Sequence, residues 1–425
     1  MPTFKTVTLG CKVNQYETEY VREGLLRLGY RSAEEDEPAD LCVVNTCTVT
    51  GEGDLKSRKI VRQLARGNPG AEIVVMGCYA TRAPEEVAAL PGVVEVLTDK
   101  RQLPDFFARR GLIDIPSGIS SFGTRHRAYV KVQDGCRLRC SYCIIPSVRP
   151  VLASRTVEEV LDEVRRLVEG GYREIVLTGI HLGHYGVDLR KHRQGGPRVN
   201  LACLLRRIAA LDGGFRVRLS SLEAVEVTPE LIAVIAGWPD RICPHLHISM
   251  QSGSDAVLAR MRRRYTAGRF VEQCRQIRQS LDRPALTTDI IVGFPGETDV
   301  DFEATCRTAE EIGFSKIHVF RFSPRRGTPA AAMPEQVPSH VAQQRSGELA
   351  KLGNLLRRQY FESLLGREMQ VLVESPQRKR PGFLVGTSER YVPVELAGAS
   401  DDLGRLVRRK AESLAGEHVV AKDTA

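Results

Sequence analysis

Short apolar runs alternate with amphipathic segments along the first third of the chain. In order, these runs and the helical segments between them occupy residues 6–9, 17–28, 41–45, 55–65 and 72–76. Such alternation is typical of parallel strands connected by helices. We therefore predict an α/β fold that begins with a doubly wound parallel sheet, in an N-terminal domain of residues 1–115.

The same alternation resumes after a connection rich in Gly, Pro and Ser. Strands are predicted at residues 128–133, 174–179, 216–221, 245–249, 286–292 and 316–320, with helical segments after them. About six strand-helix units describe a full or partial barrel, whose reactive groups lie at the carboxyl ends of the strands. We assign residues 122–360 to this central partial (β/α)6 barrel.

The last part of the chain has a different pattern. A basic amphipathic helix is predicted near residues 341–365, and short strands separated by turns follow it. These short strands predict a small all-β barrel over residues 361–425, and because five-stranded barrels are common nucleic-acid binders, we expect it to bind RNA. The basic clusters 378–380 and 408–410 could contact phosphates, or could equally be solvated loops.

The composition of the chain is that of a globular protein. Apolar residues make up 42% of the chain and charged residues 27%, as in globular proteins, which excludes large-scale disorder. The N-terminus lacks the apolar core of a signal peptide, and no run approaches the ~18 residues of a membrane span, so we expect a cytoplasmic protein without a membrane partner. The net charge of +9 supports an acidic partner such as RNA only weakly.

The strongest candidate for a reactive site is formed by Cys136, Cys140 and Cys143, which have the spacing C-x-x-x-C-x-x-C. Three thiolates can hold three corners of a four-iron cluster and leave one iron open. S-adenosylmethionine could chelate that iron. One electron from the reduced cluster would then cleave a C–S bond of S-adenosylmethionine and produce a radical. Zinc is the alternative, although structural zinc sites normally close with a fourth ligand. Disulfides fit less well without a secretion signal.

Three further cysteines occupy equivalent places in the N-terminal domain. Cys11, Cys47 and Cys78 each follow a predicted strand. Ligand sites of doubly wound sheets lie outside these strand ends, so the three could converge on a second site that again supplies three ligands. Each could instead be a small buried apolar residue, which is the commoner role of a lone cysteine.

Several segments resemble the methylthiotransferases, a family of radical S-adenosylmethionine enzymes. The cysteine loop with Tyr142 is similar to the radical cluster loop. Further matching segments are residues 9–17, 45–49, 77–79, 218–223, 247–253 and 288–298. The resemblance covers the chain from end to end and implies three units: a three-cysteine domain, a radical barrel and a small β domain of the TRAM type.

Residues 9–15 and 143–149 look most like the branch that acts on N6-threonylcarbamoyladenosine at position 37, in the anticodon loop of tRNA. The resemblance implies that one S-adenosylmethionine supplies a methyl group and another a 5′-deoxyadenosyl radical, and that a methylthio group replaces the hydrogen on carbon 2. An electron donor and a sulfur source are then needed. Alternatives are the same chemistry on isopentenyladenosine-37 or on an aspartate of ribosomal protein S12, and a non-enzymatic iron–sulfur or zinc protein that binds RNA.

The resemblance also implies roles for single residues. Cys136, Cys140 and Cys143 would hold the radical [4Fe–4S] cluster, and Cys11, Cys47 and Cys78 an auxiliary [4Fe–4S] cluster. Together with their places at the barrel rim, it assigns S-adenosylmethionine contacts to Tyr142, Gly179, Ser220, Gln251 and Val319. One departure is Pro150, which stands where the family has Gly; proline fixes φ and could reshape the loop after the cluster.

Overall fold

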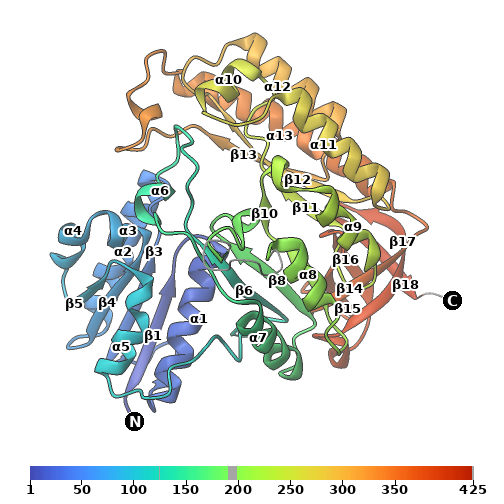
Figure 1. Cartoon of the computed structure of the whole chain (residues 1–425). Helices are drawn as coiled ribbons and strands as arrows, with labels where there is room; N and C mark the ends of the chain where they lie inside the picture. Colours follow the sequence, from blue (N-terminus) through green and yellow to red (C-terminus); the bar gives the residue numbers. More distant parts are fainter. Residues whose placement is uncertain (124, 190–198, 424–425) are drawn as a thin grey trace.

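The computed structural model describes residues 1–123, 125–189 and 199–423. Figure 1 shows three units that follow one another along the chain: an α/β unit in blue, an open arc of strands and helices from green to orange, and a small β barrel in red. The predicted α/β fold with a C-terminal all-β unit is confirmed. Within these ranges, none of the helices is long and apolar enough to cross a membrane.

The N-terminal unit is a five-stranded parallel sheet with the order β2-β1-β3-β4-β5. Its strands are β1 (Thr3–Thr8), β2 (Arg31–Ser32), β3 (Leu41–Thr46), β4 (Glu72–Gly77) and β5 (Val93–Leu97). Alternate residues of β3 and β4 enter different cores: Val43 and Val74 pack on one face, and Val44 and Val75 on the other. Helices therefore cover both faces, as a doubly wound sheet requires.

The helices of this unit lie between its strands or, for the last two, after β5. They are α1 (Lys12–Arg27), α2 (Gly51–Gly67), α3 (Cys78–Arg82), α4 (Pro84–Ala88), the short η1 (Lys100–Gln102) and α5 (Leu103–Arg109). The sequence pattern predicted a helix from residue 17, but α1 begins at Lys12. Its first turns bury the polar side chains of Asn14 and Glu17, which hide the apolar periodicity there.

Six parallel strands form the central arc. They are β6 (Arg127–Asp134), β8 (Glu174–Gly179), β9 (Arg216–Leu219), β11 (His245–Ile248), β12 (Ala285–Val292) and β13 (Lys316–Arg321). Two short strands, β7 (Ala153–Ser154) and β10 (Ser221–Leu222), extend them into two four-stranded sheets, and a bridge between Val217 and Ile242 joins the sheets. In the described part of the chain β6 and β13 do not pair, so the predicted partial barrel is confirmed.

Helices cover the outside of the arc. These helices are α7 (Val157–Glu169), α8 (Leu201–Ala209), α9 (Pro229–Gly237), α11 (Ala267–Ser280) and α12 (Asp299–Ile312). Shorter helices lie in the connections between strands: α6 (Ile145–Val148), which packs against α3, η2 (Leu182–His184), η4 (Ala224–Glu226), α10 (Asp255–Arg260) and η5 (Pro329–Ala332). α7 begins with a capping box of Thr156 and Glu159. This capping box stabilises the start of the helix, because it satisfies backbone N–H groups that have no partner within the helix. Strand residues that face these helices share one large apolar core with them.

A long helix leads from the arc to the last unit. This helix, α13 (Ser339–Glu362), packs against β13. The strands that follow are β14 (Glu368–Pro376), β15 (Phe383–Ser388), β16 (Pro393–Ala397), β17 (Leu406–Ala415) and β18 (His418–Asp423), with the short η6 (Ser400–Asp402) between β16 and β17. They close in the order β14-β15-β16-β18-β17, which confirms the predicted five-stranded barrel.

Two buried arginines of β9 attach this barrel to the arc. Arg218 donates to the backbone carbonyls of Ser388 at 3.0 Å and Glu389 at 2.9 Å. Arg216 donates to the carbonyl of Thr387 at 2.8 Å, and both guanidinium groups pair with the fully buried carboxylate of Glu174. The connection is therefore polar and directional, because each arginine binds specific carbonyl oxygens.

Candidate cluster and cofactor sites

The loop after β6 brings Cys136, Cys140 and Cys143 to one cavity of about 210 Å³, which Tyr142 also lines. The loop is folded tightly: the backbone N–H of Cys143 donates to the carbonyl of Cys140 at 3.1 Å. Gly135 begins it with φ of +78°, and a Cβ at this position would overlap the carbonyl oxygen of Val151. Glycine is therefore required where the chain leaves β6.

Nitrogen donors surround these thiols. Arg263 Nη1 lies 3.4 Å from Cys140 Sγ and Arg263 also pairs with Glu223, while His181 Nδ1 lies 3.5 Å from Cys136 Sγ. Burial raises the pKa of Cys140, and raises that of Cys143 to about 12. The thiols of Cys140 and Cys143 are thus protonated at neutral pH, and iron would convert them into thiolates that these donors stabilise.

The predicted S-adenosylmethionine contacts lie near the rim, but not all at the cavity. Tyr142 and Gln251 line it together with the three cysteines. Gly179 and Ser220 precede Ile180 and Ser221, which line the cavity in their place. Val319, on β13, packs with the core under the helices, so its side chain points away from the inside of the arc. A contact of Val319 with a ligand inside the arc would therefore use its backbone.

Three residues at this site were missed by the sequence reasoning: His181, Glu223 and Arg263. Glu223 ends the matching segment 218–223, so a signal for it existed. His181 lies two residues after the predicted strand 174–179, so its place at the barrel rim could have been inferred from the sequence. Arg263 stands among neighbouring arginines, and its approach to Cys140 depends on the three-dimensional fold, because 123 residues separate the two.

The second set of cysteines lies where the N-terminal sheet reverses its strand order. Cys11 follows β1, Cys47 follows β3 and Cys78 begins α3 directly after β4. The neighbouring strands β1 and β3 flank the reversal of the order β2-β1-β3-β4-β5, which is where such sheets bind ligands. A Cβ at Gly10 would lie 3.0 Å from Cys47 Sγ, so the first loop passes close to the second cysteine.

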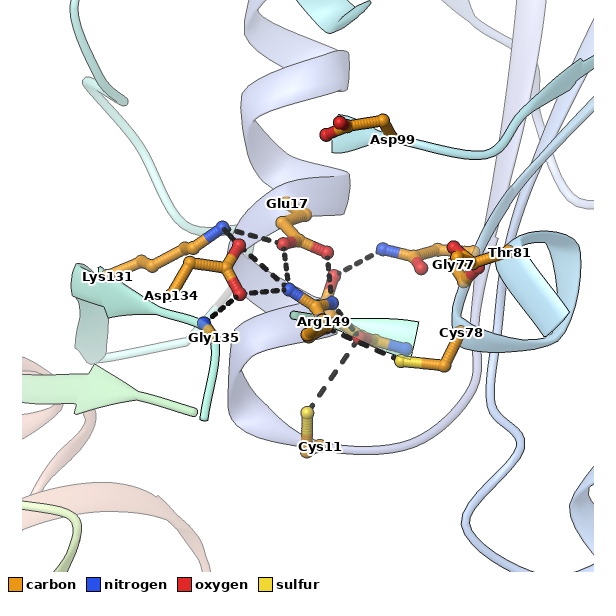
Figure 2. Close-up of polar contacts among 12 residues, drawn as sticks. Cys11, Glu17, Gly77, Cys78, Thr81, Asp99, Lys131, Asp134, Gly135 and Arg149 are labelled. Atoms are coloured by element: carbon orange, nitrogen blue, oxygen red, sulfur yellow. Dashed lines mark hydrogen bonds and ion pairs between the residues drawn. The ribbon is translucent and has the colours of Figure 1, made fainter. Parts of the chain in front are cut away.

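Arg149 lies at the centre of this region (Figure 2). It also links the region to the radical loop, because its backbone carbonyl accepts a hydrogen bond from the N–H of Cys136 at 3.2 Å. Its Nε donates to Cys78 Sγ at 3.4 Å, and its Nη2 donates to Asn14 Oδ1 at 3.0 Å. Asn14 Oδ1 in turn lies 3.8 Å from Cys11 Sγ. One side chain, six residues after Cys143, therefore contacts the surroundings of two auxiliary cysteines.

Carboxylates hold this guanidinium in place. Arg149 Nη1 binds Glu17 Oε1 at 2.7 Å and Asp134 Oδ1 at 2.9 Å, and Lys131 Nζ also binds Glu17 at 2.7 Å (Figure 2). Burial opposes the charge of Glu17, but Arg149 and Lys131 hold the pKa of its carboxyl well below the usual range. The network is ionised at neutral pH and balances buried charges against one another.

The thiols of the auxiliary set would also release protons on binding iron. Burial raises the pKa of both Cys11 and Cys47, so both are protonated before iron binds. Pro150 is exposed and lines a separate cavity with Lys100 and Arg149, not the cavity of the radical cysteines. Three converging thiols with a guanidinium donor suit a [4Fe–4S] cluster with one open iron.

The chain matches two described families. Residues 130–309 match the radical SAM superfamily, and residues 3–99 match a group described as uncharacterized protein family UPF0004. The structure of the radical S-adenosylmethionine methyltransferase TsrM from Kitasatospora setae, with tryptophan and an aza analogue of S-adenosylmethionine, is similar with a TM-score of 0.56 and 14% identity, covering 78% of this chain and 75% of that one. At this identity the likeness concerns the fold alone.

Similarity to curated proteins extends along the whole chain. The threonylcarbamoyladenosine tRNA methylthiotransferase MtaB of Bacillus subtilis (strain 168) is 39% identical, over 96% of this chain and 94% of the relative. The protein of the same name from Chlamydia pneumoniae is 41% identical over 98% of both chains. The tRNA-2-methylthio-N(6)-dimethylallyladenosine synthase of Moorella thermoacetica is 33% identical over 96% and 95%. With such identity over nearly its full length, the chain belongs to the methylthiotransferase family of radical S-adenosylmethionine enzymes.

Proposed function

We propose that this protein replaces the hydrogen on carbon 2 of N6-threonylcarbamoyladenosine, at position 37 of tRNA, with a methylthio group. The observation that carries this proposal is the 39% and 41% identity, over nearly whole chains, to relatives named for threonylcarbamoyladenosine. The relative from Moorella thermoacetica named for dimethylallyladenosine is 33% identical. We therefore rank isopentenyladenosine below threonylcarbamoyladenosine as the substrate.

The cofactors of this enzyme are two [4Fe–4S] clusters and S-adenosylmethionine. We assign the radical cluster to Cys136, Cys140 and Cys143, and the auxiliary cluster to Cys11, Cys47 and Cys78. When bound, these cofactors supply radical chemistry at carbon 2 and the methylated sulfur that replaces its hydrogen. The proposed S-adenosylmethionine contacts remain Tyr142, Gly179, Ser220, Gln251 and Val319.

Protein residues prepare both sites for this chemistry. Arg263 directs an N–H group at Cys140 and Arg149 directs one at Cys78, while the Nδ1 atom of His181 lies 3.5 Å from the sulfur of Cys136. Such donors stabilise the negative charge of ligating thiolates and fix their orientation. Tyr142 packs its ring edge-on against Phe294, with centroids 6.4 Å apart, which gives the cavity one firm aromatic wall.

The reaction needs an electron donor and a sulfur source. We infer that the protein works in the cytoplasm, because that reducing compartment keeps thiols free and clusters reduced. The C-terminal barrel would bind tRNA, because five-stranded barrels of this kind commonly bind nucleic acids. We keep the domain boundaries at residues 1–115, 122–360 and 361–425.

Mass spectrometry of tRNA nucleosides, from cells with and without the gene, tests the reaction and the substrate together. We expect 2-methylthio-N6-threonylcarbamoyladenosine only in cells that carry the gene. A change in the isopentenyladenosine derivative alone would transfer the proposal to that branch. One tightly bound zinc and no iron in the anaerobically purified protein would contradict the enzymatic function.

Variants of the two cysteine sets test the assignment of the clusters. Replacing Cys136, Cys140 and Cys143 with Ala should abolish formation of 5′-deoxyadenosine, because no iron would bind S-adenosylmethionine. Replacing Cys11, Cys47 and Cys78 with Ala should leave some 5′-deoxyadenosine but no methylthiolated product. Each triple variant should retain about four of about eight irons per chain. Methylthiolation by the second triple variant would show that the auxiliary assignment is wrong.

A further inference from the structure

A group of polar side chains on the inside of the arc is not used by either cluster site. His247, Asp289 and His318 come from the adjacent strands β11, β12 and β13. One ligand atom of each lies within 4.8 Å of the others. His247 Nε2 is 3.3 Å from Asp289 Oδ2, and the rings of His247 and His318 have centroids 5.8 Å apart. We call these three residues the inner cluster.

The alternation of side chains along the strands places the inner cluster inside the arc. Ile248 on β11, Ile290 on β12 and Ile317 on β13 belong to or pack against the apolar core beneath the outer helices. Successive side chains of a strand point to opposite faces, so the neighbouring residues of the inner cluster face the interior. They are only partly buried: the side chains of His247 and Asp289 are 13% and 30% exposed.

Lys12 brings a positive charge to the same interior. It is the first residue of α1, a helix of the N-terminal unit that packs against β6 and β8 of the arc. Its half-buried side chain acts electrostatically on His318, and Asp289 acts on it. Among the described residues, its ammonium group has no hydrogen bond or ion pair. A half-buried ammonium group without a partner is costly, and an anionic ligand would supply the missing partner.

The location connects the inner cluster to both cofactor sites. Lys12 directly follows Cys11 of the auxiliary set. On the other side, the backbone N–H of Gln251, which lines the cavity of the radical cysteines, donates to the carbonyl of Asp289 at 2.9 Å. A base that reacts with groups from both sites has to lie between them, so its substituent comes within reach of the inner cluster.

We propose that Lys12 and the inner cluster bind the threonylcarbamoyl substituent of the substrate base, with the Lys12 ammonium group paired to its carboxylate. This inference rests on the proposed function and specifies how the substrate is selected. The imidazoles of His247 and His318 can donate to carboxylate or hydroxyl oxygens. The carboxylate of Asp289 can accept the N–H groups of the carbamoyl unit.

The chemistry of the inner cluster disfavours other occupants. An isopentenyl group is apolar, and would offer no polar partner to the ammonium group of Lys12 or the imidazole of His318, whereas His247 and Asp289 already bind each other. A divalent metal ion could use His247, Asp289 and His318 as ligands, but the charge of Lys12 would repel it. A substituent that is polar and anionic satisfies all four side chains.

A competition experiment with the reconstituted holoenzyme tests the pairing of Lys12 with the carboxylate. Two anticodon stem-loop RNAs compete in one reaction: one carries N6-threonylcarbamoyladenosine, and the other carries its neutral N-methylamide. Wild type should prefer the acid by about 10- to 100-fold in kcat/KM, the range of a hydrogen bond to a charged group. In Lys12→Gln this preference should fall to within about twofold, whereas Lys12→Arg should retain most of it.

Controls separate a lost contact from a damaged protein. Lys59→Gln, which neutralises an exposed lysine of α2, should keep the preference of wild type. Lys12 adjoins Cys11, so a change of Lys12 could lower the iron content and with it kcat/KM. The dissociation constants of the two RNAs are therefore measured as well, because their ratio reports the preference without turnover. A Lys12→Gln protein that still prefers the acid as wild type does would overturn the inference. A wild type that modifies isopentenyladenosine RNA and neither test RNA would instead refute the proposed function.

Discussion

Arg149 is the single residue that ties the radical loop to the auxiliary cysteines. It is 4% exposed and contacts Glu17, Asp134, Asn14 and Cys78. A buried guanidinium group is stable only when all its donors are matched, as they are here. Its identity as an arginine therefore matters for the stability of both sites.

Arg149→Met should reduce the free energy of unfolding of the anaerobic apoprotein by about 3–5 kcal/mol, because it leaves the buried charge of Glu17 poorly compensated. Urea denaturation measures this difference. The matched control is Arg207→Met, since Arg207 is exposed and pairs only loosely with Glu158 at 3.9 Å. Equal losses in the two variants would show that the Arg149 network does not stabilise the fold.

The candidate site was only partly predictable at this scale. The six cysteines were found because spacing and strand position are written in the sequence. Arg149 and Arg263 were not given these roles, since their partners lie far away in the chain: Glu17 is 132 residues from Arg149. In a chain with 61 lysines and arginines, such a charge looks like any solvated residue until the fold brings the partners together.

At the scale of elements, strong patterns were predicted well and short or polar elements were not. The strand β8 has the predicted bounds of residues 174–179, because its apolar run is bounded by polar and glycine residues at both ends. The predicted strand 216–221 is divided into β9 and β10 around Ser220. The short strand β5 at the sheet edge was not predicted, since five residues give little periodic signal.

The turn from β6 into the radical loop gives a prediction about one element. Gly135→Ala combines an unfavourable φ with an overlap between the new Cβ and the carbonyl oxygen of Val151. The loop should shift, at a cost of about 1–3 kcal/mol. We expect loss of the radical cluster, measured as about four fewer irons per chain and as absence of 5′-deoxyadenosine.

Gly171→Ala is the matched control for this substitution. Gly171 also has a positive φ, of +95°, but nothing lies within 4 Å of the position of its Cβ. It therefore tests the strain of φ without the overlap. If Gly135→Ala and Gly171→Ala bind iron equally well, the close approach of Gly135 to Val151 is not needed for the cluster loop.

At the scale of the whole molecule, the C-terminal barrel closes one end of the arc. Tyr391 of the turn between β15 and β16 stacks on His245 of β11, with centroids 4.8 Å apart, beside the arginines of β9. The separate units were predictable from changes in pattern along the chain. Their attachment was not, because Arg216 and Arg218 bind backbone carbonyls, which any sequence provides.

The double variant Arg216→Met, Arg218→Met should release the C-terminal barrel from the arc. It removes the donors to the carbonyls of β15 and, among the residues that the structure describes, leaves buried Glu174 with Arg127 alone as a charged partner, 3.5 Å away. Loss of a buried charge pair costs about 3–5 kcal/mol, so limited proteolysis should cleave between α13 and β14 at least about tenfold faster than in wild type.

The double variant Arg206→Met, Arg207→Met controls for the loss of two positive charges, since both arginines are exposed on α8. Its proteolysis should match that of wild type. Affinity for tRNA provides a second measurement: a detached barrel no longer adds its contacts at a fixed orientation, so binding should weaken in the first variant more than in the control. If both double variants resist proteolysis equally, the arginines of β9 do not hold the two units together.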